Sequence, residues 1–202
     1  MKVILFQLFG ALAFLIGTLF VGVRIRRRST KTDAEQLSRV SHTLFWGGLV
    51  LPELIGALHP GLTAFDGLLG LPSLPYPGAM QIVGVLMLVA GIYYLAMSNL
   101  ALKTEGSGFA AFKLTRHIVA RSVYERVRNP MSLGTYSAYI GISLIADSSY
   151  LLLGTLAVIV PVHLFNLLYF EERELLARYG APYAEYMKRV PFIFPWVRHA
   201  RA

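Results

Sequence analysis

Residues 130–172 read PMSLGTYSAYIGISLIADSSYLLLGTLAVIVPVHLFNLLYFEE and contain no Lys or Arg. The stretch is strongly apolar and long enough for two membrane crossings, because a helix needs about 20 residues to span roughly 30 Å of hydrocarbon. Asp147-Ser148-Ser149 divides it into two halves and is too short to be anything but the tight turn of a helical hairpin. The sequence therefore predicts membrane spans at about 130–147 and 150–170.

The rest of the chain repeats this arrangement of apolar stretches between basic clusters. Residues 40–102 also contain no Lys or Arg, and every basic residue except Lys2 falls into one of three clusters, at 24–39, 103–128 and 173–201. The positive-inside rule makes these clusters cytoplasmic. Further spans are then predicted at about 3–23, 43–59 and 79–100.

The predicted fold is all-α, a single integral membrane domain over residues 1–202. It is a bundle of five transmembrane helices with a cytoplasmic C-terminal helical tail, three spans lying in residues 1–100. Residues 101–202 hold a basic loop, the hairpin and the tail. The N terminus is expected outside, in a multi-pass protein of the cell inner membrane if the source is bacterial. The Pro- and Gly-rich segment 59–78 is expected in the outer interface.

The composition agrees with a membrane protein. Of the 202 residues 55% are hydrophobic and 15% charged, against about 25% charged in soluble domains, which argues against a soluble enzyme and excludes a disordered chain. The absence of cysteine excludes disulfides and thiolate metal sites, and five scattered histidines have no metal-binding spacing, so no metal is expected. The net charge of +8 is divided among the loops as topology requires, so nucleic acid is not an expected partner.

Polar groups inside a membrane are costly, so they mark candidate sites. At the start of the hairpin, Asn129 is predicted to cap a helix with its side chain, and Pro130 suits the first helical position. Such a helix start offers free N–H groups and about half a positive charge, which suit a carboxylate. The alternative is an ordinary capped helix whose Arg126 and Arg128 reach lipid phosphates.

At the other end of the hairpin stand Glu171, Glu172 and Glu174. Carboxylates at a helix C-terminus oppose the helix dipole and repel one another, so they need a cation nearby. Either Arg126, Arg128 and Arg173 supply it in a structural ion-pair network, or the glutamates receive the amino group of a cationic ligand. His163 lies inside the span and is either a functional residue or a hydrogen-bond partner of a neighbouring helix.

Beyond the hairpin, Gly180 and Pro182 break the helix, and Tyr183 and Tyr186 then share one helical face. This pattern predicts a short amphipathic helix folded back under the bundle, or alternatively a membrane-surface anchor. Glu53 in the second span is predicted about 15 Å from the start of that span, at 1.5 Å per residue. It is either buried and paired or brought to the outer interface by a kink.

Taken in order, these segments resemble the isoprenylcysteine carboxyl methyltransferase and phospholipid methyltransferase family. The resemblance covers about residues 115–195 and rests on Tyr124, Arg128-Asn129-Pro130, Glu171-Glu172 with Leu175, Tyr179-Gly180, and Tyr183 with Tyr186. The chain departs from the protein-methylating members at Asn129 and Ser132, where those usually carry His and Tyr.

The resemblance implies a methyltransferase that binds S-adenosylmethionine at the cytoplasmic end of spans four and five, under the tail. It implies Arg128 and Glu172 as catalytic candidates, and as cofactor-binding residues Tyr124, Arg128, Asn129, Pro130, Glu171, Glu172 and, as a further candidate, His163. The partners would be membrane lipids and a lipophilic or lipidated acceptor. A carboxylate of the isoprenylcysteine type is expected, because a carboxylate needs no general base. The alternatives are a phospholipid or small-amine N-methyltransferase, a thiol methyltransferase and, more distantly, a non-catalytic membrane scaffold.

Overall fold

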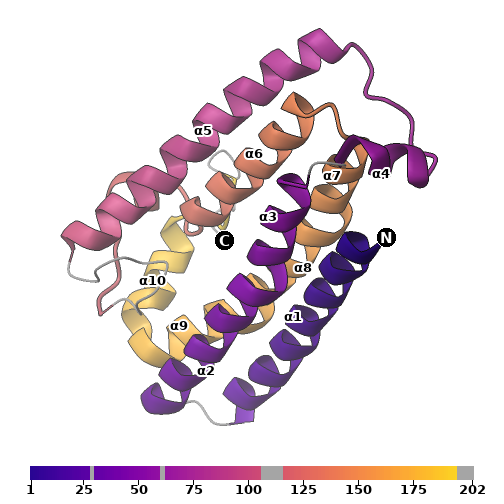
Figure 1. Cartoon of the computed structure of the whole chain (residues 1–202). Coiled ribbons are helices and arrows are strands. Elements are labelled where there is room, and N and C mark those ends of the chain that lie inside the picture. The colour runs from indigo at the N-terminus through magenta and orange to yellow at the C-terminus, as the bar shows by residue number, and fades with distance from the viewer. Residues whose placement is uncertain (28–29, 60–61, 106–115, 195–202) are drawn as a thin grey trace.

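The computed structural model describes residues 1–27, 30–59, 62–105 and 116–194, and these residues form helices and connecting loops only (Figure 1). The predicted all-α fold is therefore confirmed. The elements are α1 (Lys2–Arg27), α2 (Lys31–Leu44), η1 (Phe45–Val50), α3 (Leu51–Ala57), α4 (Leu62–Leu68), α5 (Pro77–Thr104), η2 (Ser122–Glu125), α6 (Pro130–Ile145), α7 (Ser149–Gly154), η3 (Thr155–Ile159), α8 (Val160–Asn166), η4 (Leu167–Glu171), α9 (Glu172–Tyr179) and α10 (Ala181–Arg189).

Two groups of these elements follow one another without a break and form long rods. The first rod joins α2, η1 and α3 over residues 31–57, and the second joins α7 to α9 over Ser149–Tyr179. The segments η1, η3 and η4 within them are π-helices. A π-helix turn is wider than an α-helix turn and shifts the phase of the side chains that follow it.

Three helices are long and apolar enough to cross a membrane, namely Lys2–Arg27, Pro77–Thr104 and Ser149–Tyr179. They contain the predicted spans 3–23, 79–100 and 150–170. Large apolar side chains also cover the outside of the bundle, for example Phe9, Phe20, Ile82 and Leu86. Lipid covers such a surface at no cost in exposed apolar area, so the protein is an integral membrane helical bundle.

The other two predicted spans, 43–59 and 130–147, coincide with the first rod and with α6. With 16 residues, α6 is about 24 Å long at 1.5 Å per residue, shorter than the hydrocarbon core. The count of five spans and the orientation of the termini stay predictions.

Helices α5 and α6 pack closely through glycines spaced seven residues apart on each helix. A Cβ atom added at Gly91 would lie 2.7 Å from the carbonyl oxygen of Gly134, and one added at Gly141 would lie 2.7 Å from that of Gly84. No side chain fits between the backbones at these two crossings. Small residues allow such close approach of helices in lipid, where burial of apolar area does not drive association.

The predicted hairpin turn is confirmed, since α6 ends and α7 begins on either side of residues 146–148. The Ser148 hydroxyl caps α7 by accepting from the amide of Leu151 at 3.3 Å. Asp66 of α4 accepts from the Tyr150 amide at 2.6 Å and from the Ser148 hydroxyl at 3.1 Å. The segment predicted to lie in the outer interface is therefore fastened to the tip of the hairpin.

The tail folds back under the bundle, as the sequence predicts. Gly180 has φ +60° and separates α9 from α10, and the side chains of Tyr183 and Tyr186 are buried. The Tyr186 hydroxyl donates to the carbonyl oxygen of Tyr124 at 2.7 Å. Because both tyrosines of α10 face protein, the tail is packed onto the bundle, and the alternative of a membrane-surface anchor is not needed for them.

Glu53 on α3 is buried, with 8% of its surface exposed. It hydrogen-bonds Gln7 of α1, which in turn accepts from the hydroxyl of Tyr150. Of the two interpretations offered by the sequence, the structure therefore supports the buried and paired carboxylate rather than one that reaches the outer interface.

Candidate functional site

A cavity of about 440 Å³ is lined in part by residues of α9 and α10, the helices that fold back at the end of the bundle. Its walls come from the first rod, α5, α6, the second rod and α10. This volume lies within the range of about 300–1,000 Å³ that is typical of small-molecule sites. Charged and polar side chains gather toward the tail, among them His42, Arg128, Glu171, Glu174 and Arg178. Apolar residues line the part nearer the middle of the bundle, among them Phe45, Val50, Leu95, Ala138 and Ile142.

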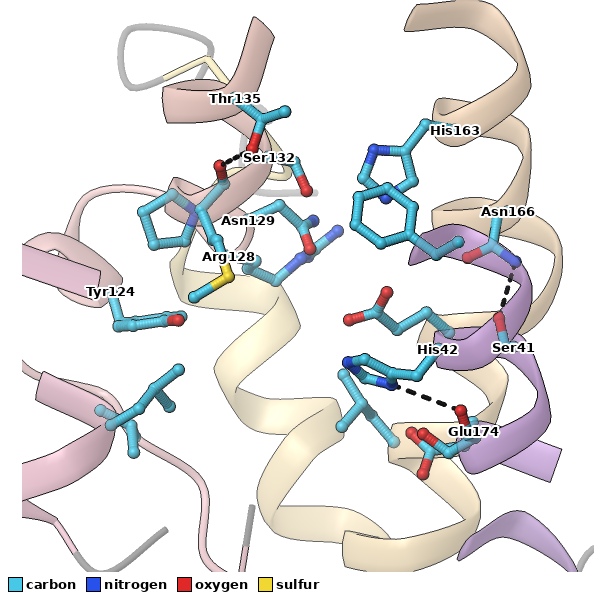
Figure 2. Close-up of a pocket in the computed structure, with 18 of the residues that line it drawn as sticks. Ser41, His42, Tyr124, Arg128, Asn129, Ser132, Thr135, His163, Asn166 and Glu174 are labelled. Atoms are coloured by element: carbon cyan, nitrogen blue, oxygen red, sulfur yellow. Dashed lines mark hydrogen bonds between the residues drawn. The ribbon is translucent and has the colours of Figure 1, made fainter. Parts of the chain in front are cut away.

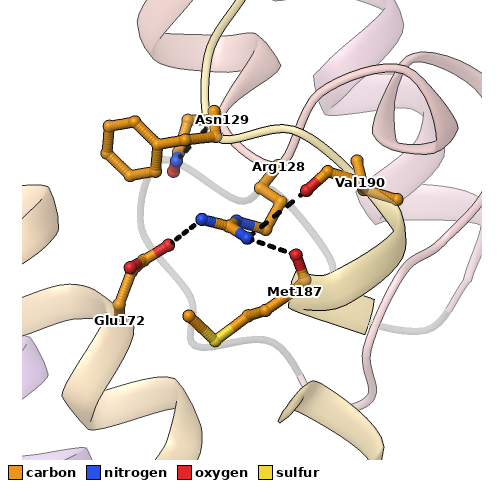
Figure 3. A network of polar contacts seen from close by, with 6 residues as sticks. Arg128, Asn129, Glu172, Met187 and Val190 are labelled. Carbon is orange, nitrogen blue, oxygen red and sulfur yellow. Dashed lines mark hydrogen bonds and ion pairs between the residues drawn. The ribbon is translucent and has the colours of Figure 1, made fainter. Parts of the chain in front are cut away.

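Arg128 and Glu172, the predicted catalytic pair, are brought together as an ion pair. Arg128 Nη2 lies 2.6 Å from Glu172 Oε1, and both side chains are largely buried. Figure 3 shows that Arg128 Nη1 also donates to the carbonyl oxygens of Met187 at 2.7 Å and Val190 at 3.3 Å. Arg128 lines the cavity, whereas Glu172 is not among its lining residues. The guanidinium thus holds α9 and the tail against the start of α6.

The predicted helix start at Asn129-Pro130 is confirmed, because α6 begins at Pro130. The prediction that the Asn129 side chain caps this helix is wrong. Its Nδ2 donates instead to the carbonyl oxygen of Phe192 at 3.1 Å, and no side chain caps α6. The Asn129 side chain binds the tail instead of the helix, and a local sequence pattern does not show where the tail lies. Asn129 and Pro130 both line the cavity.

Two carboxylates of the predicted cluster, Glu171 and Glu174, do line the cavity. Glu171 ends the π-helix η4. Glu174 lies 2.9 Å from Arg178 Nη1, and the two side chains are 2% and 4% exposed. Among the ion pairs of the described residues, Arg178 on α9 supplies the cation for Glu174 and Arg128 supplies that for Glu172, whereas none of these pairs involves Glu171.

His163 lies deeper in the cavity wall, on α8 (Figure 2). Its Nδ1 and the hydroxyl of Tyr136 are 3.0 Å apart and share a hydrogen bond. The ring of Phe45 stacks on the imidazole, with centroids 4.5 Å apart and planes inclined by 30°. These contacts fix the orientation of the imidazole.

Three tyrosines close the cavity on the side of the tail, and Tyr124, the predicted cofactor residue, is one of them; the others are Tyr183 and Tyr186. Burial, the largest cause in each case, raises the pKa of all three phenols above its usual value. All three therefore stay protonated at neutral pH, and each hydroxyl keeps a proton that it can donate.

Sequence reasoning missed several polar residues of the wall, namely Ser41, His42, Asn99 and Asn166. Asn166 Nδ2 donates to the hydroxyls of Thr18 at 2.9 Å and Ser41 at 3.1 Å. Asn99 Nδ2 donates to the carbonyl oxygen of Leu95 at 2.9 Å. The signal that could have found the two asparagines is an amide side chain within a long apolar helix.

Metal ligands are not grouped in the described part of the chain. No three His, Cys, Asp or Glu side chains lie together there in a way that could hold a metal ion. The cavity described above is thus built from ion pairs, amides, hydroxyls and aromatic rings.

A family model described as phospholipid methyltransferase matches residues 79–182, just over half of the 202 residues. No curated protein and no solved structure matches the chain. The matched residues include nearly all of α5 together with α6 and the second rod, and these elements form most of the cavity wall. The resemblance noted from the order of the sequence segments is thereby confirmed. The chain belongs to the phospholipid methyltransferase family.

Proposed function

We propose that the protein is a methyltransferase that uses S-adenosylmethionine to methylate a lipophilic acceptor within the membrane. The observation that carries this proposal is the polarity of the cavity described above, which has charges of both signs toward the tail and apolar walls toward the middle of the bundle. A small zwitterionic molecule suits the first part and a lipid-like molecule suits the second. Family membership supports methyl transfer as the reaction.

The polar part of the cavity fits an amino acid group such as the one that S-adenosylmethionine carries. In the described residues, Asn99 Oδ1 and Arg128 Nε are buried and have no hydrogen-bond partner, and both residues line the cavity. An open acceptor and an open donor leave room for the amino and carboxylate groups of a ligand. Glu171 would add a negative charge for the amino group.

The aromatic and helix-start residues would hold the remaining part of the cofactor. Tyr124 and the Asn129-Pro130 turn lie in the wall beside Asn99 and Arg128. When bound, S-adenosylmethionine supplies a methyl group on a positively charged sulfur. The residues around it would exclude water and align the acceptor behind that methyl group.

The main role of Arg128 and Glu172 would be to close the site. Their ion pair and the bonds of Arg128 to the tail hold α10 over the cavity. Arg128 Nε is buried and has no hydrogen-bond partner among the described residues, so the same side chain could serve both closure and binding. Glu172 lies outside the lining, so we propose a positioning role for it rather than direct contact with the amino group.

A carboxylate remains the first candidate for the acceptor, because it is ionised at neutral pH and needs no base. A lipid amine is the second candidate. His42 and Glu171, both in the wall, are groups that could accept the proton that an ammonium must lose.

The test uses the full chain, purified and placed in lipid nanodiscs. Calorimetric titration with S-adenosylmethionine should give saturable binding. Tritium from the labelled methyl group should pass to one member of a set of acceptors consisting of a prenylcysteine analogue, phosphatidylethanolamine and an alkyl thiol. Asn99→Leu should weaken cofactor binding, whereas Tyr93→Phe on the lipid-facing surface of α5 should not. Absence of both binding and transfer would overturn the proposal.

A further inference from the structure

His163 lies where the polar and apolar parts of the cavity meet. On the second rod it stands eight residues before Glu171, which is about 12 Å along the axis at 1.5 Å per residue. On its other side the wall continues with Val50 and Ile142. A cofactor in the polar part and a lipophilic acceptor in the apolar part would meet at this level. His163 is therefore placed beside the reacting group of the acceptor.

The hydrogen bond between Tyr136 and His163 Nδ1 couples the phenol hydroxyl to the tautomer of the imidazole. In the described part of the chain, the contact of 3.0 Å with His163 Nδ1 is the one hydrogen bond of the Tyr136 side chain. The direction of this bond depends on the imidazole tautomer, and the arrangement used below has the Tyr136 hydroxyl as donor and Nδ1 as acceptor. In this arrangement the neutral imidazole carries its proton on Nε2.

The Nε2–H group has no hydrogen-bond acceptor among the described residues, although His163 is only 7% exposed and lines the cavity. Ser132 lies opposite on α6, 8% exposed, and its hydroxyl also has no partner in the described part of the chain. Figure 2 shows the two side chains pointing into the same space from opposite walls. The level at which the polar and apolar parts of the cavity meet, called the junction below, thus offers two neutral donors.

We propose that His163 Nε2–H and the Ser132 hydroxyl hold one oxygen of an acceptor carboxylate, so that the other oxygen faces the methyl group. This inference rests on the proposed function and names the acceptor class. The two donors are specificity residues that touch the substrate, and Tyr136 is a positioning residue that acts through His163.

Neutral donors suit this reaction because a carboxylate oxygen is the nucleophile and must keep its negative charge available for the attack. A cation such as Arg128 would bind both oxygens and stabilise the negative charge, which would make the carboxylate a weaker nucleophile. The Nη groups of Arg128 are, in addition, already bound to Glu172 and the tail. The free oxygen forms a bond to the methyl carbon, the carbon–sulfur bond breaks, and its electron pair stays on sulfur. The products are a methyl ester and a neutral thioether, and no proton moves.

An amine acceptor fits this junction poorly. An ammonium group needs acceptors, whereas Nε2 presents a proton. The titratable groups that act electrostatically on His163 and Tyr136 are His42 and Glu171. If an amine were the acceptor, one of these two groups would take its proton, and loss of the His163 donor would not select between acceptors.

The kinetic test compares dodecanoate with dodecylamine, which have matched chains, in nanodiscs with saturating S-adenosylmethionine. We expect His163→Phe to raise KM for dodecanoate about tenfold to a hundredfold, the value of a hydrogen bond to a charged group. His163→Gln keeps a donor near the Nε2 position and should restore most of the affinity. Tyr136→Phe should give a smaller increase, with Tyr93→Phe as its lipid-facing control. The dissociation constant of S-adenosylmethionine should stay unchanged in all of them.

A spectroscopic test needs no cofactor. In protein labelled with nitrogen-15 at its five histidines, the signal that disappears in His163→Gln belongs to His163. It should report the Nε2–H tautomer, and dodecanoate but not dodecylamine should move the Nε2 proton downfield. In Tyr136→Phe the two tautomers should mix.

Three results would overturn the proposal. These are an Nδ1–H tautomer in the wild type, equal losses for both acceptors in His163→Phe, and weaker cofactor binding with an unchanged KM for dodecanoate. A wild type that binds no S-adenosylmethionine would instead refute the proposed function, and the spectroscopic test would still decide whether His163 binds a carboxylate.

Discussion

Arg128 Nη2 lies 2.6 Å from Glu172 Oε1, and the pair is buried where the loop before α6, the end of the second rod and the tail meet. The same guanidinium donates to the carbonyl oxygen of Met187. A single side chain therefore connects three segments that are far apart in the sequence. Its loss should affect the fold of the tail as well as the cavity behind it.

The first prediction concerns this ion pair. Glu172→Gln removes the negative partner of a buried guanidinium, and a hydrogen bond to a charged group is worth about 1.5–3 kcal/mol. We expect a lower melting temperature and faster proteolysis of the tail. The matched control is Glu185→Gln, because Glu185 forms an exposed pair with Lys188. If both variants melted together with the wild type, Arg128 would not depend on Glu172.

The second prediction concerns the conservative change Arg128→Lys. An ammonium keeps the charge but lacks the planar fork that reaches Glu172 and the Met187 carbonyl together. We expect weaker binding of S-adenosylmethionine and a lower melting temperature, both measured on the same preparation. Retention of both values would show that charge alone suffices at this position.

The third prediction concerns the open acceptor on α5. Asn99→Leu removes the unpartnered Oδ1, and a neutral hydrogen bond is worth about 0.5–1.5 kcal/mol, so the dissociation constant of the cofactor should rise roughly twofold to tenfold. Thr104→Val changes a polar residue of the same helix that does not line the cavity and bonds only its own helix. Calorimetry should find the control unchanged, and an equal loss in both would assign the effect to the helix.

The fourth prediction concerns the close approach of α5 and α6. Gly91→Ala would place a methyl group 2.7 Å from backbone atoms of α6, so the helices must move apart, at a cost of about 1–3 kcal/mol. Gly154→Ala meets nothing within 4 Å and should be neutral or slightly stabilising. Melting curves of the two variants decide this, and equal stability would contradict the packing described.

The fifth prediction concerns topology. The chain contains no cysteine, so single cysteines can be labelled from either side of the membrane. Lys31→Cys, Arg121→Cys and Glu185→Cys should react with an impermeant reagent from the cytoplasmic side, and Leu69→Cys from the outer side. Labelling of Leu69→Cys and Arg121→Cys from the same side would refute the five-span arrangement.

Features encoded by local chemistry were predictable from the sequence. The start of α6 at Pro130 and the break at Gly180 follow from the backbone limits of these residues. The hairpin follows from its short polar turn. By contrast, the role of Asn129 was mispredicted, because its partner Phe192 is 63 residues away and a local sequence pattern does not reveal so distant a contact.

The different positions of the Glu171 and Glu172 side chains could not be predicted from the sequence either. The two residues are neighbours, yet one lines the cavity and the other holds Arg128. Glu171 ends a π-helix, whose wider turn changes the direction in which the following side chains point. A reading based on 3.6 residues per turn contains no such shift. Asn99 and Tyr136 were missed because their importance depends on which helix faces them.

The bonds between the tail and the loop before α6 have a consequence for the order in which the protein matures. The amides of Arg128 and Asn129 donate to the carbonyl oxygens of Pro191 and Phe192 at 2.9 and 3.2 Å. A ribosome that works from the N-terminal end releases α6 and the second rod into the membrane before these acceptors are made. These bonds, which hold the tail to the loop before α6, therefore form only after residue 192 has left the ribosome.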